Sequence, residues 1–107
     1  VSAHAPDSDL RSVFGPLGVP LAVYCHIHRP FVREMEALTV ANAGSLALSA
    51  DGDWRASYLL VEDGVPRLRR VEFDLERAVA DILGSRYPGA EALADMQRTG
   101  LFRPARF

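Results

Sequence analysis

An apolar run at residues 21–30 ends in two histidines that are one residue apart. Read as a β-strand, this run alternates between two faces, and His26 and His28 lie on the same face. The two imidazoles are then roughly 6.5–7 Å apart along the strand. Side chains at that spacing can reach one metal ion or serve the two ions of a metal pair. The pattern is also compatible with two histidines that are only hydrogen-bonded or solvent-exposed at a strand end.

The hydrophobic pattern of the whole chain predicts a mixed α/β arrangement. The expected elements are the end of a strand at residues 1–4, helices at 7–14, 75–83 and 90–98, strands at 21–28, 35–41, 54–61 and 66–73, and a turn at 29–34. The Asp63-Gly64 turn favours an antiparallel hairpin of the last two strands. The first strand, helix and strand fit a βαβ crossover. The strands of His4 and His26 are therefore expected to be parallel neighbours, with both histidines at one edge of the sheet, where ligand sites lie.

Two turn signals follow the histidines. The first is the tight loop at residues 42–45, in which Gly44 can adopt a positive φ. By itself this pattern is that of a plain turn. The second is Asp51-Gly52, and we interpret Asp51 and Asp53 as turn residues rather than metal ligands, because a turn explains both.

Composition narrows the class of protein. The 107 residues suffice for one domain or part of one, and 49% of them are hydrophobic, which is enough for a packed core. The single cysteine cannot form an intrachain disulfide, and residues 1–10 lack the basic and apolar blocks of a secretory signal. No apolar run is long enough to cross a bilayer, and a net charge of −2 disfavours a nucleic acid as a structural partner. These features predict a cytoplasmic protein without a membrane partner.

Two segments carry a resemblance to a known family. The sequence AVYCHIHRPF at residues 22–31 is followed by VANAGS at residues 40–45. Together they resemble the last conserved part of the calcineurin-like metallophosphoesterases, of the small bacterial and archaeal phosphodiesterase type. There, a buried strand runs into Gly-His-Thr-His-x-Pro and the next strand ends in Asn-Pro-Gly-Ser. The departures from this pattern are Cys25 for glycine, Ile27 for threonine and Ala43 for proline. The resemblance extends through the expected hairpin and covers residues 1–82.

The resemblance implies a fold and a site. The fold would be mixed α/β, with residues 1–107 forming one partial domain, the C-terminal half of a four-layer αββα sandwich, and residues 74–107 forming its helical end and tail. The positions that match the family's metal ligands are His4, His26 and His28. By the family pattern, His4 and His26 would serve one ion and His28 the other. The positions that match the loop supporting the metals are Asn42, Gly44 and Ser45.

The resemblance also implies a reaction. Members of the family hydrolyse phosphate mono- or diesters with two divalent cations (Mn, Ni, Zn or Fe) and an activated water molecule. The family's other ligand motifs, Asp-x-His, Gly-Asp-x-x-Asp and Gly-Asn-His, do not occur in this chain. We therefore expect the chain to supply only histidine ligands and to be inactive by itself. The expected partners are a phosphoester substrate and either the missing N-terminal half or a second copy of the chain in a homo-oligomer.

An alternative is a non-catalytic metal-binding or interaction domain that keeps the fold without the chemistry. His4, Cys25, His26 and His28 would then form a closed zinc site with four ligands. In a regular strand, however, Cys25 falls on the face opposite the two histidines. A lone cysteine is also often simply buried.

Overall fold

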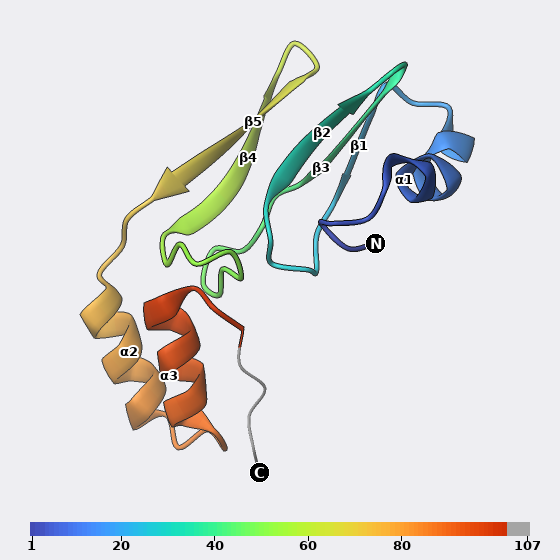
Figure 1. The fold of residues 1–107 in the computed structure, drawn as a ribbon. Helices are drawn as coiled ribbons and strands as arrows, with labels where there is room; N and C mark the ends of the chain where they lie inside the picture. Colours follow the sequence, from blue (N-terminus) through green and yellow to red (C-terminus); the bar gives the residue numbers. More distant parts are fainter. Residues whose placement is uncertain (103–107) are drawn as a thin grey trace.

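The computed structural model describes residues 1–102 of the chain (Figure 1). In chain order the elements are α1 (Asp7–Phe14), the 3-10 helix η1 (Gly15–Leu17), β1 (Leu21–Tyr24), β2 (Phe31–Met35), β3 (Leu38–Asn42), β4 (Ala56–Glu62), β5 (Val65–Val71), α2 (Leu75–Gly84) and α3 (Ala90–Thr99). The fold is mixed α/β with two small sheets, as predicted. No helix in the described part is long and apolar enough to cross a membrane. Residues 103–107 of the expected tail lie outside the described residues.

The first sheet places the ends of two strands side by side. Its strand order is β1-β3-β2. β1 runs parallel to β3, with Tyr24 opposite Asn42, so both strands end at the same edge of the sheet. β2 runs antiparallel to β3. Among residues 1–102, no strand pairs with the outer side of β1. The loops that follow β1 and β3 therefore lie at the same edge of the sheet. Ligand sites of α/β folds lie at this edge, outside the carboxyl ends of the strands.

Helix α1 packs against this sheet (Figure 1). The buried residues of that core are Leu10, Ala22, Leu38 and Val40. Tyr24 extends the core, with its ring centroid 5.3 Å from that of Phe14 and 5.9 Å from that of Phe31. Burial raises the pKa of the Tyr24 hydroxyl, and the positive charge of Arg33 opposes that shift. The hydroxyl therefore remains a neutral donor at neutral pH, and the core holds the end of β1 in place.

The strand predicted at residues 1–4 is wrong, because this segment forms a turn. The N–H of Ala5 donates to the Ser2 carbonyl (3.0 Å), and the backbone N–H of His4 donates to Ser2 Oγ (3.1 Å). The guanidinium of Arg33 donates to two carbonyls of this segment and ties it to β2. The parallel neighbour of β1 is therefore β3, and not the segment that contains His4.

The turn predicted at residues 29–34 is also wrong, because most of it belongs to β2. Phe31 and Met35 pack against the core beneath α1. The guanidinium of Arg33 lies 5.7 Å from the centroid of the Phe31 ring. A charged side chain that is held by the N-terminal turn and by an aromatic ring is compatible with a strand, although the charge alone suggested a loop.

The C-terminal half agrees with the sequence predictions. β4 and β5 form an antiparallel hairpin in which Glu62 pairs with Val65 around the Asp63-Gly64 turn. The Asp74 carboxylate caps α2 by accepting from the Arg77 N–H (3.1 Å). Helix α3 ends at Gly100, which has a left-handed backbone. These elements were predictable because their boundaries depend on local turn and capping signals.

Candidate functional site

The two histidines lie in the loop after β1. The strand itself ends at Tyr24, so the predicted alternation of strand faces does not place His26 and His28. Both residues instead adopt a left-handed backbone, with φ of 85° and 54°. That conformation costs roughly 1–2 kcal/mol for a residue with a Cβ atom. Strained backbone at chemically capable side chains is common at functional sites.

The ring of His28 is held in one orientation. Its Nδ1 lies 2.9 Å from the carbonyl oxygen of Leu48. Because a carbonyl only accepts, Nδ1 carries the proton and Nε2 of the neutral ring keeps a free lone pair. The N–H of Ala50 donates to the His28 carbonyl (2.9 Å) and fastens the same two segments. A carbonyl partner on one ring nitrogen is a usual way of orienting an imidazole for metal binding through the other.

His26 and His28 share one cavity of about 580 Å³. Its other lining residues are Ile27, Leu48, Ser49, Ala50, Met96 and Phe102. His4 instead lines a separate cavity of about 430 Å³ beside α1. The structure therefore brings two of the three predicted metal ligands to one cavity and places the third on another.

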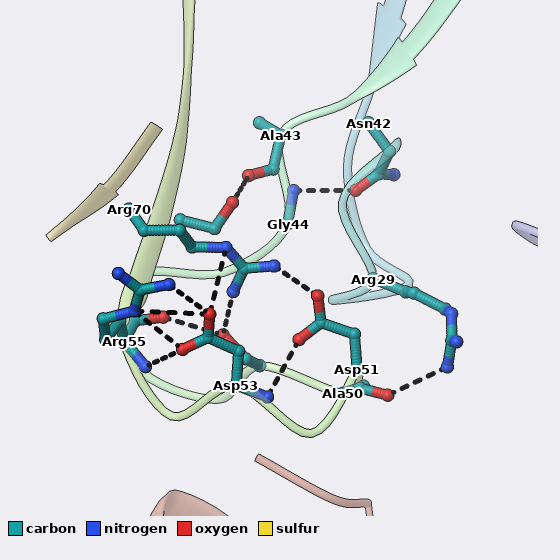
Figure 2. Close-up of polar contacts among 11 residues, drawn as sticks. Arg29, Asn42, Ala43, Gly44, Ala50, Asp51, Asp53, Arg55 and Arg70 are labelled. Atoms are coloured by element: carbon teal, nitrogen blue, oxygen red, sulfur yellow. Dashed lines mark hydrogen bonds and ion pairs between the residues drawn. The ribbon is translucent and has the colours of Figure 1, made fainter. Parts of the chain in front are cut away.

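The loop at residues 42–45 has the predicted glycine geometry. Gly44 has a φ of 76°, and its N–H donates to Asn42 Oδ1 (2.9 Å; Figure 2). Ser45 Oγ accepts from the N–H of Leu48 (3.0 Å) and so steadies the segment whose carbonyl holds His28. Asn42 is fully buried, and its Nδ2 has no hydrogen-bond partner among the described residues. The two N–H donors of the Asn42 amide thus lie at the edge where β1 and β3 end, near the Tyr24 hydroxyl, where they oppose the rise in pKa that burial causes.

Ser57, at the start of β4, anchors the same loop although its sequence context does not mark it. The residue is buried, and its hydroxyl donates to the carbonyl of Ala43 (2.9 Å). Its backbone N–H donates to the carbonyl of Ser45 (2.9 Å). A serine within an alternating strand gives no sequence signal for such a contact. The role of the Leu48 carbonyl cannot be predicted from the sequence either, because every residue carries a backbone carbonyl.

An ion-pair network joins the turn at residues 51–53, which follows the cavity wall, to the hairpin (Figure 2). Arg70 of β5 pairs with Asp51, and its Nε lies 3.8 Å from Asp53. Arg55 Nη2 donates to the Asp53 carboxylate (2.7 Å). The carboxylates also accept backbone N–H groups within the turn, Asp51 from Asp53 (3.3 Å) and Asp53 from Arg55 (3.0 Å). Both aspartates are therefore turn residues, as predicted, and they also pair with arginines.

Acid is expected to weaken this network at Asp53. Hydrogen bonds from the side chain and then the backbone of Arg55 lower the pKa of Asp53 from 3.8 to about 2. A carboxyl with a lowered pKa stabilises the fold above its unfolded pKa and loses that contribution as the pH falls toward the folded value. Because Asp53 is 29% exposed, solvent screening reduces the expected contribution to about 1 kcal/mol.

Urea unfolding measured above pH 3.8 and again near pH 2 tests this expectation. Between these two pH values, the free energy of unfolding of the wild type should fall by about 1 kcal/mol more than that of the Asp53→Asn variant. Asp81→Asn, which removes an exposed carboxylate of α2, serves as the control and should follow the wild type. Equal acid losses in the wild type and Asp53→Asn would contradict the role of Asp53.

The donor set fits part of a metal coordination shell. His26 and His28 present imidazoles, and His28 has a free Nε2, which suits Zn²⁺ and similar ions. Within residues 1–102, no cluster of three or more His, Cys, Asp or Glu side chains is arranged to hold a metal. Cys25 is exposed, and the four-ligand zinc site of the alternative hypothesis is not formed in this part of the chain. Further ligands would have to come from outside the described residues.

Two solved structures share this fold. The crystal structure of a metallophosphoesterase from Sphaerobacter thermophilus matches with a TM-score of 0.76 and 24% sequence identity, over 87% of this chain and 48% of that one. The crystal structure of a hypothetical protein from Pyrococcus horikoshii OT3 matches with a TM-score of 0.78 and 16% identity, over 94% of this chain and 40% of that one. No family model matches the chain, and no curated protein matches it significantly.

The match covers most of this chain but less than half of each solved structure. At these identities the likeness establishes the fold. The resemblance predicted from the AVYCHIHRPF and VANAGS segments is confirmed at that level. The chain therefore has the fold of part of a metallophosphoesterase domain.

Proposed function

We propose that this chain supplies imidazole ligands to the metal centre of a metal-dependent phosphoesterase that hydrolyses phosphate mono- or diesters. The observation that carries the proposal is the His28 ring, whose Nδ1 is bonded to the Leu48 carbonyl and whose Nε2 has no hydrogen-bond partner among residues 1–102, on a cavity that His26 also lines. The likeness of the fold to that of a metallophosphoesterase supports the same assignment.

The residues of the chain have distinct roles in this proposal. His26 binds one cation of a pair and His28 the other, and the Leu48 carbonyl fixes the tautomer and orientation of His28. The loop at residues 42–45 supports that carbonyl through Ser45. When bound, a pair of divalent cations (Mn, Ni, Zn or Fe) supplies Lewis acidity toward a phosphoryl oxygen and lowers the pKa of water. His4 would join the ligands only if the turn at residues 1–5 rearranged, because it lines another cavity.

The proposed centre needs carboxylates that residues 1–102 do not bring to the histidines. We propose that they belong to the N-terminal half of the fold, or to a second copy of the chain. The outer side of β1 is a suitable place for that part to join, because its backbone has no strand partner among residues 1–102. By itself, the chain should show no turnover of a p-nitrophenyl phosphoester above background in the presence of Mn²⁺.

Metal affinity tests the proposal directly. The wild-type chain should bind Zn²⁺, and the doubly substituted His26→Ala/His28→Ala variant should bind it at least about tenfold more weakly, as measured by isothermal titration calorimetry. Tyr87→Ala, which alters an exposed residue between α2 and α3, is the control and should bind like the wild type. Unchanged Zn²⁺ affinity in the double variant would contradict the proposal.

A further inference from the structure

We infer that the cavity beside His28 binds an aromatic group of the phosphoester, so that the site prefers aryl phosphates over nucleotides or inorganic phosphate. The inference rests on the proposed function for the phosphate end of the ligand. The cavity itself is defined independently, by its lining residues and its volume of about 580 Å³. That volume lies within the range of roughly 300–1,000 Å³ that is usual for small-molecule sites.

The cavity wall is apolar except at the histidines. The apolar lining residues are Ile27, Leu48, Ala50, Met96 and Phe102. The remaining polar side chain, Ser49, is buried, and its hydroxyl already donates to the Arg55 carbonyl (3.1 Å). Among residues 1–102, no charged side chain lines the cavity. A ligand that fits this wall is polar at the imidazole end and apolar over the remainder.

The chemistry of the wall favours an aromatic group over a nucleoside. The thioether of Met96 and the ring of Phe102 both make favourable contacts with aromatic rings. A purine or pyrimidine would bury ring donors and acceptors against apolar side chains, and each unpaired polar group would weaken binding. An unsubstituted aryl group carries no such groups.

Most of the wall is also preformed, because three separate segments are fastened to one another, whereas Phe102 is 74% exposed. The N–H of Ala50 donates to the His28 carbonyl (2.9 Å). Gln97 of α3 donates from Nε2 to the Ala47 carbonyl (3.1 Å), next to the cavity. The N–H of Gly52 donates to the carbonyl of Gly100, at the end of α3 (2.9 Å). A ligand therefore need not order these segments when it binds.

The two methionines of the chain provide a built-in comparison. Met96 lines the cavity, whereas Met35 packs on the core beneath α1. In the metal-free chain labelled with ¹³C at the methionine methyl groups, 1-naphthyl phosphate and 1-naphthol should each shift the Met96 signal saturably and leave Met35 unchanged. Inorganic phosphate should shift neither signal. Absence of a Met96 shift with both aryl compounds, or equal shifts of Met96 and Met35, would overturn the inference.

Matched variants sharpen the test. Phe102→Ala should weaken binding of 1-naphthyl phosphate about tenfold, because it removes one aromatic wall. Leu101→Ala, which alters the neighbouring exposed residue outside the cavity lining, should leave the affinity unchanged. Equal losses in both variants would contradict binding in this cavity.

The two proposals fail separately. Met96 shifts without Zn²⁺ binding would support the aryl cavity and remove the phosphoesterase assignment. Zn²⁺ binding by His26 and His28 without Met96 shifts would support the metal centre and remove the aryl preference.

Discussion

Replacing Gly100 by alanine is expected to lower the free energy of unfolding by about 3 kcal/mol, the largest single effect that we expect from a glycine in this chain. Gly100 has a φ of 67°, and a Cβ atom there would lie 2.8 Å from both the N and the carbonyl C of Asp53. These are backbone atoms that cannot rotate away. The end of α3 or the turn at residues 51–53 would have to move, and the hydrogen bond between Gly52 and Gly100 would be strained or lost.

Gly18→Ala is the matched control for Gly100→Ala. Gly18 has nearly the same backbone, with a φ of 65°, but a Cβ atom there meets nothing within 4 Å. Gly18→Ala should therefore lower the free energy of unfolding only by the cost of a left-handed backbone at a residue with a Cβ atom, about 1 kcal/mol. Urea unfolding followed by circular dichroism gives both values. Equal losses in the two variants would mean that the close approach to Asp53 does not contribute.

Replacing Gly44 by alanine should lower the free energy of unfolding by about 2 kcal/mol and also disturb the proposed metal site. Its φ is 76°, and a Cβ atom would lie 2.9 Å from Ser57 Oγ and 3.0 Å from Pro30 Cβ. The first contact displaces the hydroxyl that bonds to Ala43. The second pushes on the loop that contains His28. Zn²⁺ affinity should therefore fall together with stability.

Gly64→Ala separates backbone strain from crowding. Gly64 has a φ of 75° in the hairpin turn, and a Cβ atom there has nothing within 4 Å. This variant should lose about 1 kcal/mol of stability and keep the Zn²⁺ affinity of the wild type. If Gly44→Ala and Gly64→Ala have the same free energy of unfolding and the same Zn²⁺ affinity, the loop at residues 42–45 does not support the site.

Local signals account for the parts of the fold that the sequence predicted correctly. Asp63-Gly64 marks the hairpin, Asp74 caps α2 and Gly100 ends α3, and each signal acts on residues close to it in the chain. β2 was missed because it is stabilised by pairing with β3 and by packing under α1, whereas Arg33 and Glu34 suggest an exposed turn. Such non-local contacts override local propensity.

The site was predictable only in part, for a similar reason. The spacing of His26 and His28 pointed to a shared site, and the structure places both on one cavity. The left-handed backbone of both histidines and the contact of His28 with the Leu48 carbonyl could not be predicted from the residue types. His4 was expected beside them on the assumption that residues 1–4 form a strand next to β1. That strand is absent, because Arg33 and Ser2 hold the segment in a turn.

The most direct test of the proposed metal centre is long-range ¹H–¹⁵N NMR of the imidazole nitrogens during a Zn²⁺ titration. At a pH at which the ring is neutral, His28 should show a protonated Nδ1 and an unprotonated Nε2 before Zn²⁺ is added, because the Leu48 carbonyl requires a donor at Nδ1. Zn²⁺ should then shift the Nε2 signal of His28 together with the ring signals of His26, while the Nδ1–H of His28 persists. If the His26 and His28 signals stay unchanged at saturating Zn²⁺, the chain does not supply imidazole ligands to a metal centre.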